Sequence, residues 1–103
     1  MSNIIAIDIG NTETTVGIGA NGDWDSYRFT TRDTNTSDEL LSLFNSTFQM
    51  TEEMKKNLRG SIICSVVPQI TANVSQAIKK YANVESLIVG PGVKTGLKVN
   101  IDN

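Results

Sequence analysis

The sequence has no histidine and only one cysteine, and each of these features removes a class of site. Without histidine, imidazole-based acid–base catalysis and most zinc sites are excluded. Cys64 cannot form an intramolecular disulfide, and its place within an apolar run predicts a buried, inert thiol. We therefore expect a protein of a reducing compartment, the cytoplasm.

Long apolar runs and an excess of basic charge are also missing. No stretch approaches the length that crosses a bilayer, and the first residues lack the basic and apolar regions of a secretory signal, so we expect no membrane partner. The net charge is −2, which provides no basic surface for nucleic acid. Any phosphate binding must therefore come from local geometry. A chain of 103 residues is long enough for one domain with one core.

The most informative segment is a polar turn near the amino terminus. An apolar run at 4–7 leads into it and an alternating run at 16–18 leads out, so the turn joins two strands. Gly10 is expected to allow a positive φ, and the small polar side chains around it can approach an anion closely. The same composition is typical of an ordinary hairpin turn, and that interpretation stays open. The predicted phosphate site comprises Asp8, Ile9, Gly10, Asn11, Thr12, Glu13, Thr14 and Thr15.

The carboxylate of Asp8 within this turn favours a bound magnesium ion. Mg²⁺ takes oxygen ligands, keeps several of its waters and joins carboxylates to phosphate oxygens. We therefore expect Asp8 to hold Mg²⁺ through water.

The rest of the sequence alternates strands and helices. Strands are expected at residues 3–9, 14–20, 24–31, 61–67 and 84–89. The second and third are joined by Asn21-Gly22, a pair typical of two-residue hairpins, and the apolar fourth is expected to be central and covered on both faces. Helices are expected after Thr36, between Thr51 and Gly60, and from Pro68 onward. This order predicts an α/β fold of the ribonuclease H-like type, a mixed five-stranded sheet with flanking helices.

Two later segments are candidates for contact with a substrate. Ser65 precedes Pro68 at the carboxyl end of the central strand, where α/β sheets bind their ligands. The Gly90-Pro91-Gly92 segment ends the last strand. Both also have structural interpretations, because Ser65 can cap a helix and the glycines can form a stiff turn.

The segment from Asp8 to Thr12 resembles the first phosphate motif of the actin, sugar-kinase and heat-shock ATPase superfamily, and its Asn-Thr ending is most similar to type III pantothenate kinases. Two further segments, Ser65 to Pro68 and Val89 to Leu97, agree with that family in order and spacing. The resemblance implies ATP-dependent phosphorylation of pantothenate, the first step of coenzyme A biosynthesis. It also implies Mg²⁺, a monovalent cation (K⁺ or NH₄⁺) and a homodimer in the intact enzyme, with the substrate near Ser65, Gly90, Pro91 and Gly92.

The resemblance covers only the amino-terminal part of that family. Residues 1–103 are expected to form a single ribonuclease H-like lobe, in which residues 90–103 begin the substrate-binding segment, while the second lobe is absent. The family's catalytic aspartate lies in a Gly-x-Asp-Arg motif expected beyond Asn103, so no catalytic residue is assigned. Ile101 stands where the family has a substrate-contacting tyrosine. We therefore expect the chain alone to be inactive.

Other functions remain open at this stage. One is a non-catalytic regulatory or binding module of the transcriptional accessory type, and another is a kinase for sugars or short acids. A two-metal nuclease needs several carboxylates at the strand ends. The strand at 61–67 supplies none, which disfavours the nuclease.

Overall fold

The computed structural model describes residues 3–20 and 22–90, which form one mixed sheet with helices packed on it. The strands are β1 (Asn3–Ile9), β2 (Glu13–Ala20), β3 (Asp23–Thr30), β4 (Leu58–Ser65) and β5 (Ser86–Val89). The helices are α1 (Ser37–Thr47), α2 (Glu52–Lys56) and α3 (Pro68–Ala82). The strand order is β3-β2-β1-β4-β5. The predicted α/β class and its mixed five-stranded sheet are confirmed.

The first three strands form an antiparallel meander, whereas β1, β4 and β5 run parallel. The turn between β2 and β3 includes Gly22 at a φ of 82°, as its sequence predicts; Asn21 lies outside the described residues. The register of this hairpin pairs Ala20 with Asp23 and Glu13 with Thr30. The end of β3 therefore lies beside the beginning of β2, next to the glycine turn.

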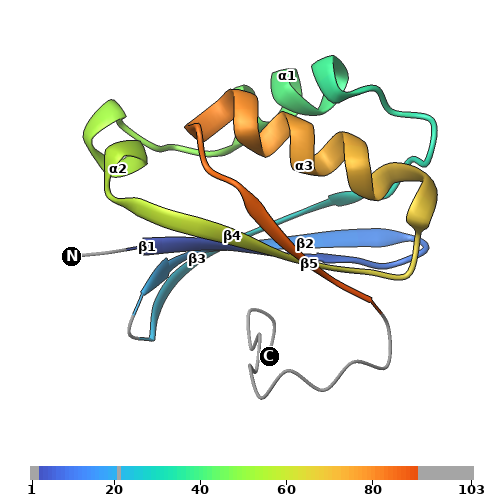
Figure 1. The fold of residues 1–103 in the computed structure, drawn as a ribbon, viewed down its shortest axis with the longest axis horizontal. Helices are drawn as coiled ribbons and strands as arrows, with labels where there is room; N and C mark the ends of the chain where they lie inside the picture. The colour runs from blue at the N-terminus through green and yellow to red at the C-terminus, as the bar shows by residue number, and fades with distance from the viewer. Residues whose placement is uncertain (1–2, 21, 91–103) are drawn as a thin grey trace.

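All three helices of the described residues lie on one face of the sheet (Figure 1). Alternate residues of β1 point toward them, and Ile5, Ile7 and Ile9 are each at most 1% exposed. Phe44 of α1 is fully buried in the same core. Burial of this apolar surface is the main stabilising term of the fold. Within residues 3–20 and 22–90 no helix lies on the other face of β4, where Ile62 and Cys64 are half-buried, so helices of this part of the chain cover only one of the two faces that were predicted to be covered.

The helix starts follow the sequence closely. At α1 the Thr36 hydroxyl accepts from the backbone N–H of Glu39 at 3.1 Å, and the Glu39 carboxylate accepts from the Thr36 N–H at 2.8 Å. This reciprocal pair satisfies two backbone donors that the helix itself leaves open. Pro68 occupies the first turn of α3, where its missing N–H costs nothing.

Several element boundaries differ from the predicted ones. The sequence placed Leu58 in the second helix and Gly60 at its end, but both belong to β4. Helix α2 ends at Lys56 because the next residues pair with β1. The carbonyl of Asn57 accepts from the N–H of Asn3, the first residue of β1. The strand also ends earlier than predicted, at Ser65, so residues 66 and 67 leave the sheet.

Among the described helices, none is long and apolar enough to cross a membrane.

Candidate functional site: a polar cavity at the carboxyl ends of β1 and β4

The candidate site lies where β1 and β4 end side by side. Ile9 pairs with Ser65 at the last position of the two strands, and the N–H of Val66 donates to the carbonyl of Ile9 at 3.1 Å. Because parallel strands have their carboxyl ends at the same edge, the turn after β1 and the segment leading into α3 are neighbours. This is the edge at which open α/β sheets generally bind ligands.

The glycine turn after β1 is closed by a short hydrogen bond. The N–H of Gly10 donates to the carbonyl of Glu13 at 3.0 Å. A Cβ at position 10 would lie 3.0 Å from that same oxygen, which is tighter than ordinary van der Waals contact. The φ of Gly10 is not positive, so the reason predicted from the sequence is wrong. A side chain at position 10 would crowd the Glu13 carbonyl, and this close approach of the backbone to itself favours glycine in the turn.

The residues predicted for the phosphate site divide by the direction of their side chains. The exposed ones are Asp8, Asn11, Thr12 and Glu13. The buried ones are Ile9, Thr14 and Thr15. The side chain of Ile9 points into the core, and the Thr14 hydroxyl is hydrogen bonded to Thr31 at 2.7 Å. A ligand on the surface of the turn therefore contacts the four exposed side chains and the backbone of the turn.

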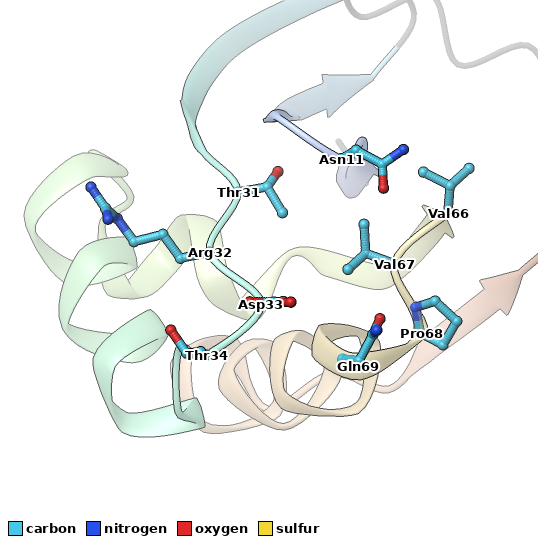
Figure 2. A pocket seen from close by; sticks show the side chains of 9 residues that line it. All are labelled: Asn11, Thr31, Arg32, Asp33, Thr34, Val66, Val67, Pro68 and Gln69. Carbon is cyan, nitrogen blue, oxygen red and sulfur yellow. The ribbon is translucent and has the colours of Figure 1, made fainter.

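A polar cavity of about 510 Å³ opens beside this turn (Figure 2). It is lined by Asn11, Thr31, Arg32, Asp33, Thr34, Val66, Val67, Pro68 and Gln69. Asn11, Asp33 and Gln69 surround the same space, whereas the side chain of Arg32 extends away from it (Figure 2). The cavity has the size of a small-molecule site and hydrogen-bonding groups from three separate segments.

Sequence reasoning missed one whole wall of this cavity, the loop at 31–34, and also missed Gln69. The signal for the loop was present in the Asn21-Gly22 hairpin. A two-residue loop there pairs residue 13 with residue 30, which places the next residues beside the glycine turn. Gln69 follows Pro68 directly, so the predicted start of the helix at Pro68 was enough to place it at this edge of the sheet.

The loop at 31–34 is held at both ends. The N–H of Thr31 donates to the carbonyl of Thr12 at 2.8 Å, which ties the loop to the glycine turn. At the other end, the side-chain amide of Asn73 on α3 donates to the carbonyl of Asn35 at 3.0 Å. The loop is therefore held to the glycine turn by a backbone hydrogen bond and to α3 by a side-chain hydrogen bond.

Ser65 has a structural use in the described fold. Its buried hydroxyl accepts from the N–H of Val67 at 3.0 Å and from the Thr71 hydroxyl at 2.9 Å, and it donates to the Val67 carbonyl at 3.2 Å. These bonds fix the entry into α3. The N-cap of α3 is Val67 and no side chain caps the helix, so the interpretation of Ser65 as a helix cap is wrong; its contact with a substrate stays a prediction.

The structure does bring Ser65 and Gly90 together. Both line a second cavity of about 350 Å³. Its other lining residues are Pro68, Thr71, Ala72, Ile88 and Val89. Pro68 also lines the polar cavity, so the two spaces lie on either side of the α3 start. Pro91 and Gly92 lie outside the described residues.

Asp8 is exposed and has no hydrogen bond or ion pair within the described part of the chain. Its strand neighbour in β4 is Cys64, and the carboxylate is close enough to affect that thiol. Burial raises the pKa of Cys64, and the charge of Asp8 raises it further. Residues 3–20 and 22–90 contain no cluster of three metal-binding side chains, so a metal here would keep most of its waters. An unpaired carboxylate of this kind fits water-mediated binding of Mg²⁺.

The effect of Asp8 on Cys64 provides a test of this geometry. We expect Asp8→Asn to lower the pKa of Cys64 and to accelerate alkylation at pH 8, by less than about tenfold because burial is the larger cause. The rate of iodoacetamide modification against pH measures the shift. Glu53→Gln, an exposed carboxylate on α2, is the matched control and should leave the rate unchanged. Equal rates in all three proteins would show that Asp8 does not face Cys64.

A mixed sheet of this strand order with helices packed on it is a ribonuclease H-like α/β domain. The solved structure of T. thermophilus RuvC in complex with Holliday junction substrate shares the fold, with a TM-score of 0.52 and 13% identity over 88% of this chain and 66% of that one. A likeness at this identity concerns the fold alone.

Sequence comparison identifies the family. The model of the type III pantothenate kinase family matches residues 4–103, and the chain belongs to that family. It is 34% identical to the type III pantothenate kinase of Bifidobacterium animalis subsp. lactis and 41% identical to that of Listeria welshimeri, in each case over 97% of this chain. The chain spans 40% and 39% of the length of these two relatives.

Proposed function

We propose that the chain is the nucleotide-binding amino-terminal lobe of a two-lobed cytoplasmic kinase that transfers the γ-phosphoryl group of ATP to pantothenate. The observation that carries the proposal is the family match over residues 4–103. The glycine turn beside a polar cavity supports it from the structure, since a kinase needs hydrogen-bond donors close to the nucleotide phosphates.

In this proposal the exposed part of the turn binds the phosphates. Asn11 and the backbone N–H groups after Gly10 contact phosphoryl oxygens, and the absence of a Cβ at Gly10 lets the turn stay closed. Asp8 holds Mg²⁺ through water. The ion, when bound, neutralises charge on the phosphoryl group being transferred. Thr14 contributes indirectly, through its hydrogen bond to Thr31.

The acceptor is proposed to lie on the other side of Pro68. The cavity that joins Ser65 and Gly90 is the described space closest to the predicted substrate segment, and it is largely apolar. The aspartate that serves as base is proposed to lie beyond Asn103 and the monovalent cation site in the second lobe, and the intact enzyme is proposed to be a homodimer. We propose no nucleic-acid partner, because the chain carries a net charge of −2.

The direct test is an ADP-release assay with and without pantothenate. The intact two-lobed protein should release ADP only when pantothenate, ATP and Mg²⁺ are all present, whereas residues 1–103 alone should give background. Phosphoryl transfer requires donor, metal and acceptor held in line in a closed cleft, which one lobe cannot supply. Release driven by a sugar or another short acid would reassign the acceptor. Full turnover by residues 1–103 would contradict the division of roles between the lobes.

A further inference from the structure

Thr14 and Thr31 form a hydroxyl pair beneath the polar cavity. Their Oγ1 atoms are 2.7 Å apart, and they lie 17 positions apart in the sequence. Thr14 belongs to β2 and is 1% exposed, whereas Thr31 is partly exposed and lines the cavity. One member of the pair is therefore sealed in the core, and the other faces the space where a ligand would lie.

The burial of Thr14 bears on which hydroxyl donates. A hydroxyl has one proton to donate, and a buried donor without an acceptor destabilises the fold. Thr31 Oγ1 is the acceptor that the described residues offer to the Thr14 hydroxyl. The geometry allows either hydroxyl to donate, and the burial of Thr14 favours Thr14 as the donor, which leaves the proton of Thr31 available to a group in the cavity.

We propose that Thr31 is a further phosphate-binding residue, which donates its hydroxyl proton to a phosphoryl oxygen of the nucleotide; this rests on the proposed function. Its side chain points from its loop toward Asn11, across the cavity (Figure 2). Its N–H donates to the carbonyl of Thr12 at 2.8 Å, so its position follows that of the glycine turn. A hydroxyl already accepting a hydrogen bond is oriented and polarised for donation to an anion.

The test compares removal of each hydroxyl in the intact two-lobed enzyme. Thr31→Val should raise the KM for Mg·ATP about tenfold or more, the usual effect of losing a hydrogen bond to a charged group. The kcat should change little, because the bond is made in the ground state as well as in the transition state. Thr31→Ser should restore the KM. Thr30→Val, a matched change at the neighbouring exposed residue of β3, should leave both constants unchanged.

Thr14→Val separates ligand binding from a purely structural role. If Thr31 binds the nucleotide, Thr14→Val should raise the KM less than Thr31→Val, because the Thr31 hydroxyl remains. If the pair only fastens β2 to the loop, the two substitutions should have equal effects, and this result would overturn the proposal. If Thr31→Val destabilises the protein, the comparison is repeated with Thr31→Ala, whose smaller side chain cannot crowd the cavity. If the wild-type enzyme binds Mg·ATP and Thr31→Val leaves the KM unchanged, only this inference is contradicted. If the wild-type protein has no affinity for the nucleotide, the proposed function is contradicted.

Discussion

Asp8→Asn in the intact kinase should reduce kcat by about a hundredfold or more while leaving the fold stable. The carboxylate is exposed and lacks a partner among the described residues, so its loss should change the free energy of unfolding by less than about 0.5 kcal/mol. Catalysis should suffer because, in the proposed function, this carboxylate would orient the Mg²⁺ that neutralises charge on the transferring phosphoryl group. Steady-state kinetics at saturating Mg·ATP, together with a thermal melt, measure the two effects separately.

The matched control for this substitution is Glu53→Gln on α2, which also removes one exposed carboxylate. It should leave kcat unchanged. Partial recovery of Asp8→Asn at high Mg²⁺ concentration would agree with a role in holding the metal. Normal turnover by a folded Asp8→Asn enzyme would remove Asp8 from that role.

Gly10→Val should weaken nucleotide binding more than any other single change in the turn. The new Cβ would lie 3.0 Å from the Glu13 carbonyl, which is the acceptor that closes the turn. The Glu13 carbonyl must shift by a few tenths of an ångström to relieve this contact, which displaces the backbone donors that we propose bind the phosphates. We expect at least a tenfold loss of affinity for Mg·ATP by calorimetry, about 1.4 kcal/mol, with a smaller loss for Gly10→Ala.

Gly60→Ala is the control for adding a side chain to a glycine of the sheet. The nearest atom to its Cβ would be the Glu85 carbonyl at 3.9 Å, an ordinary contact. Nucleotide affinity should therefore stay at the wild-type value. If Gly10→Val bound Mg·ATP as tightly as wild type, the phosphates would have to be bound by another part of the chain.

Local signals were enough to predict most of the fold. The capping box at Thr36 and Glu39 involves residues three apart, and Pro68 restricts only its own backbone, so each could be recognised in isolation. The hairpin between β2 and β3 was equally local. The start of β4 was missed because it depends on pairing of Leu58 with Asn3, which are distant in sequence. Tertiary pairing overrode the helical pattern there.

The candidate site was predictable to a lesser degree. The motif at 8–15 located the turn correctly at the carboxyl edge, but it could not show that Ile9 and Thr14 point into the core. That distinction depends on which face of each strand packs against the helices. The role of Gly10 was also misjudged, because a close approach between backbone atoms is visible only in three dimensions. The loop at 31–34 carries no motif. It lines the cavity because the hairpin register places it beside the glycine turn.

The central claim is that the glycine turn and the loop at 31–34 together bind the nucleotide phosphates. Titration of Mg·ATP into the ¹⁵N-labelled chain, followed through backbone amide shifts, tests it most directly. We expect the shifts to concentrate at residues 10–13, 31–34 and 66–69, and to grow only at high nucleotide concentration because one lobe leaves the adenosine in solvent. Shifts confined to the opposite end of the sheet, around Lys55 and Lys80, or no shifts at any concentration, would contradict it.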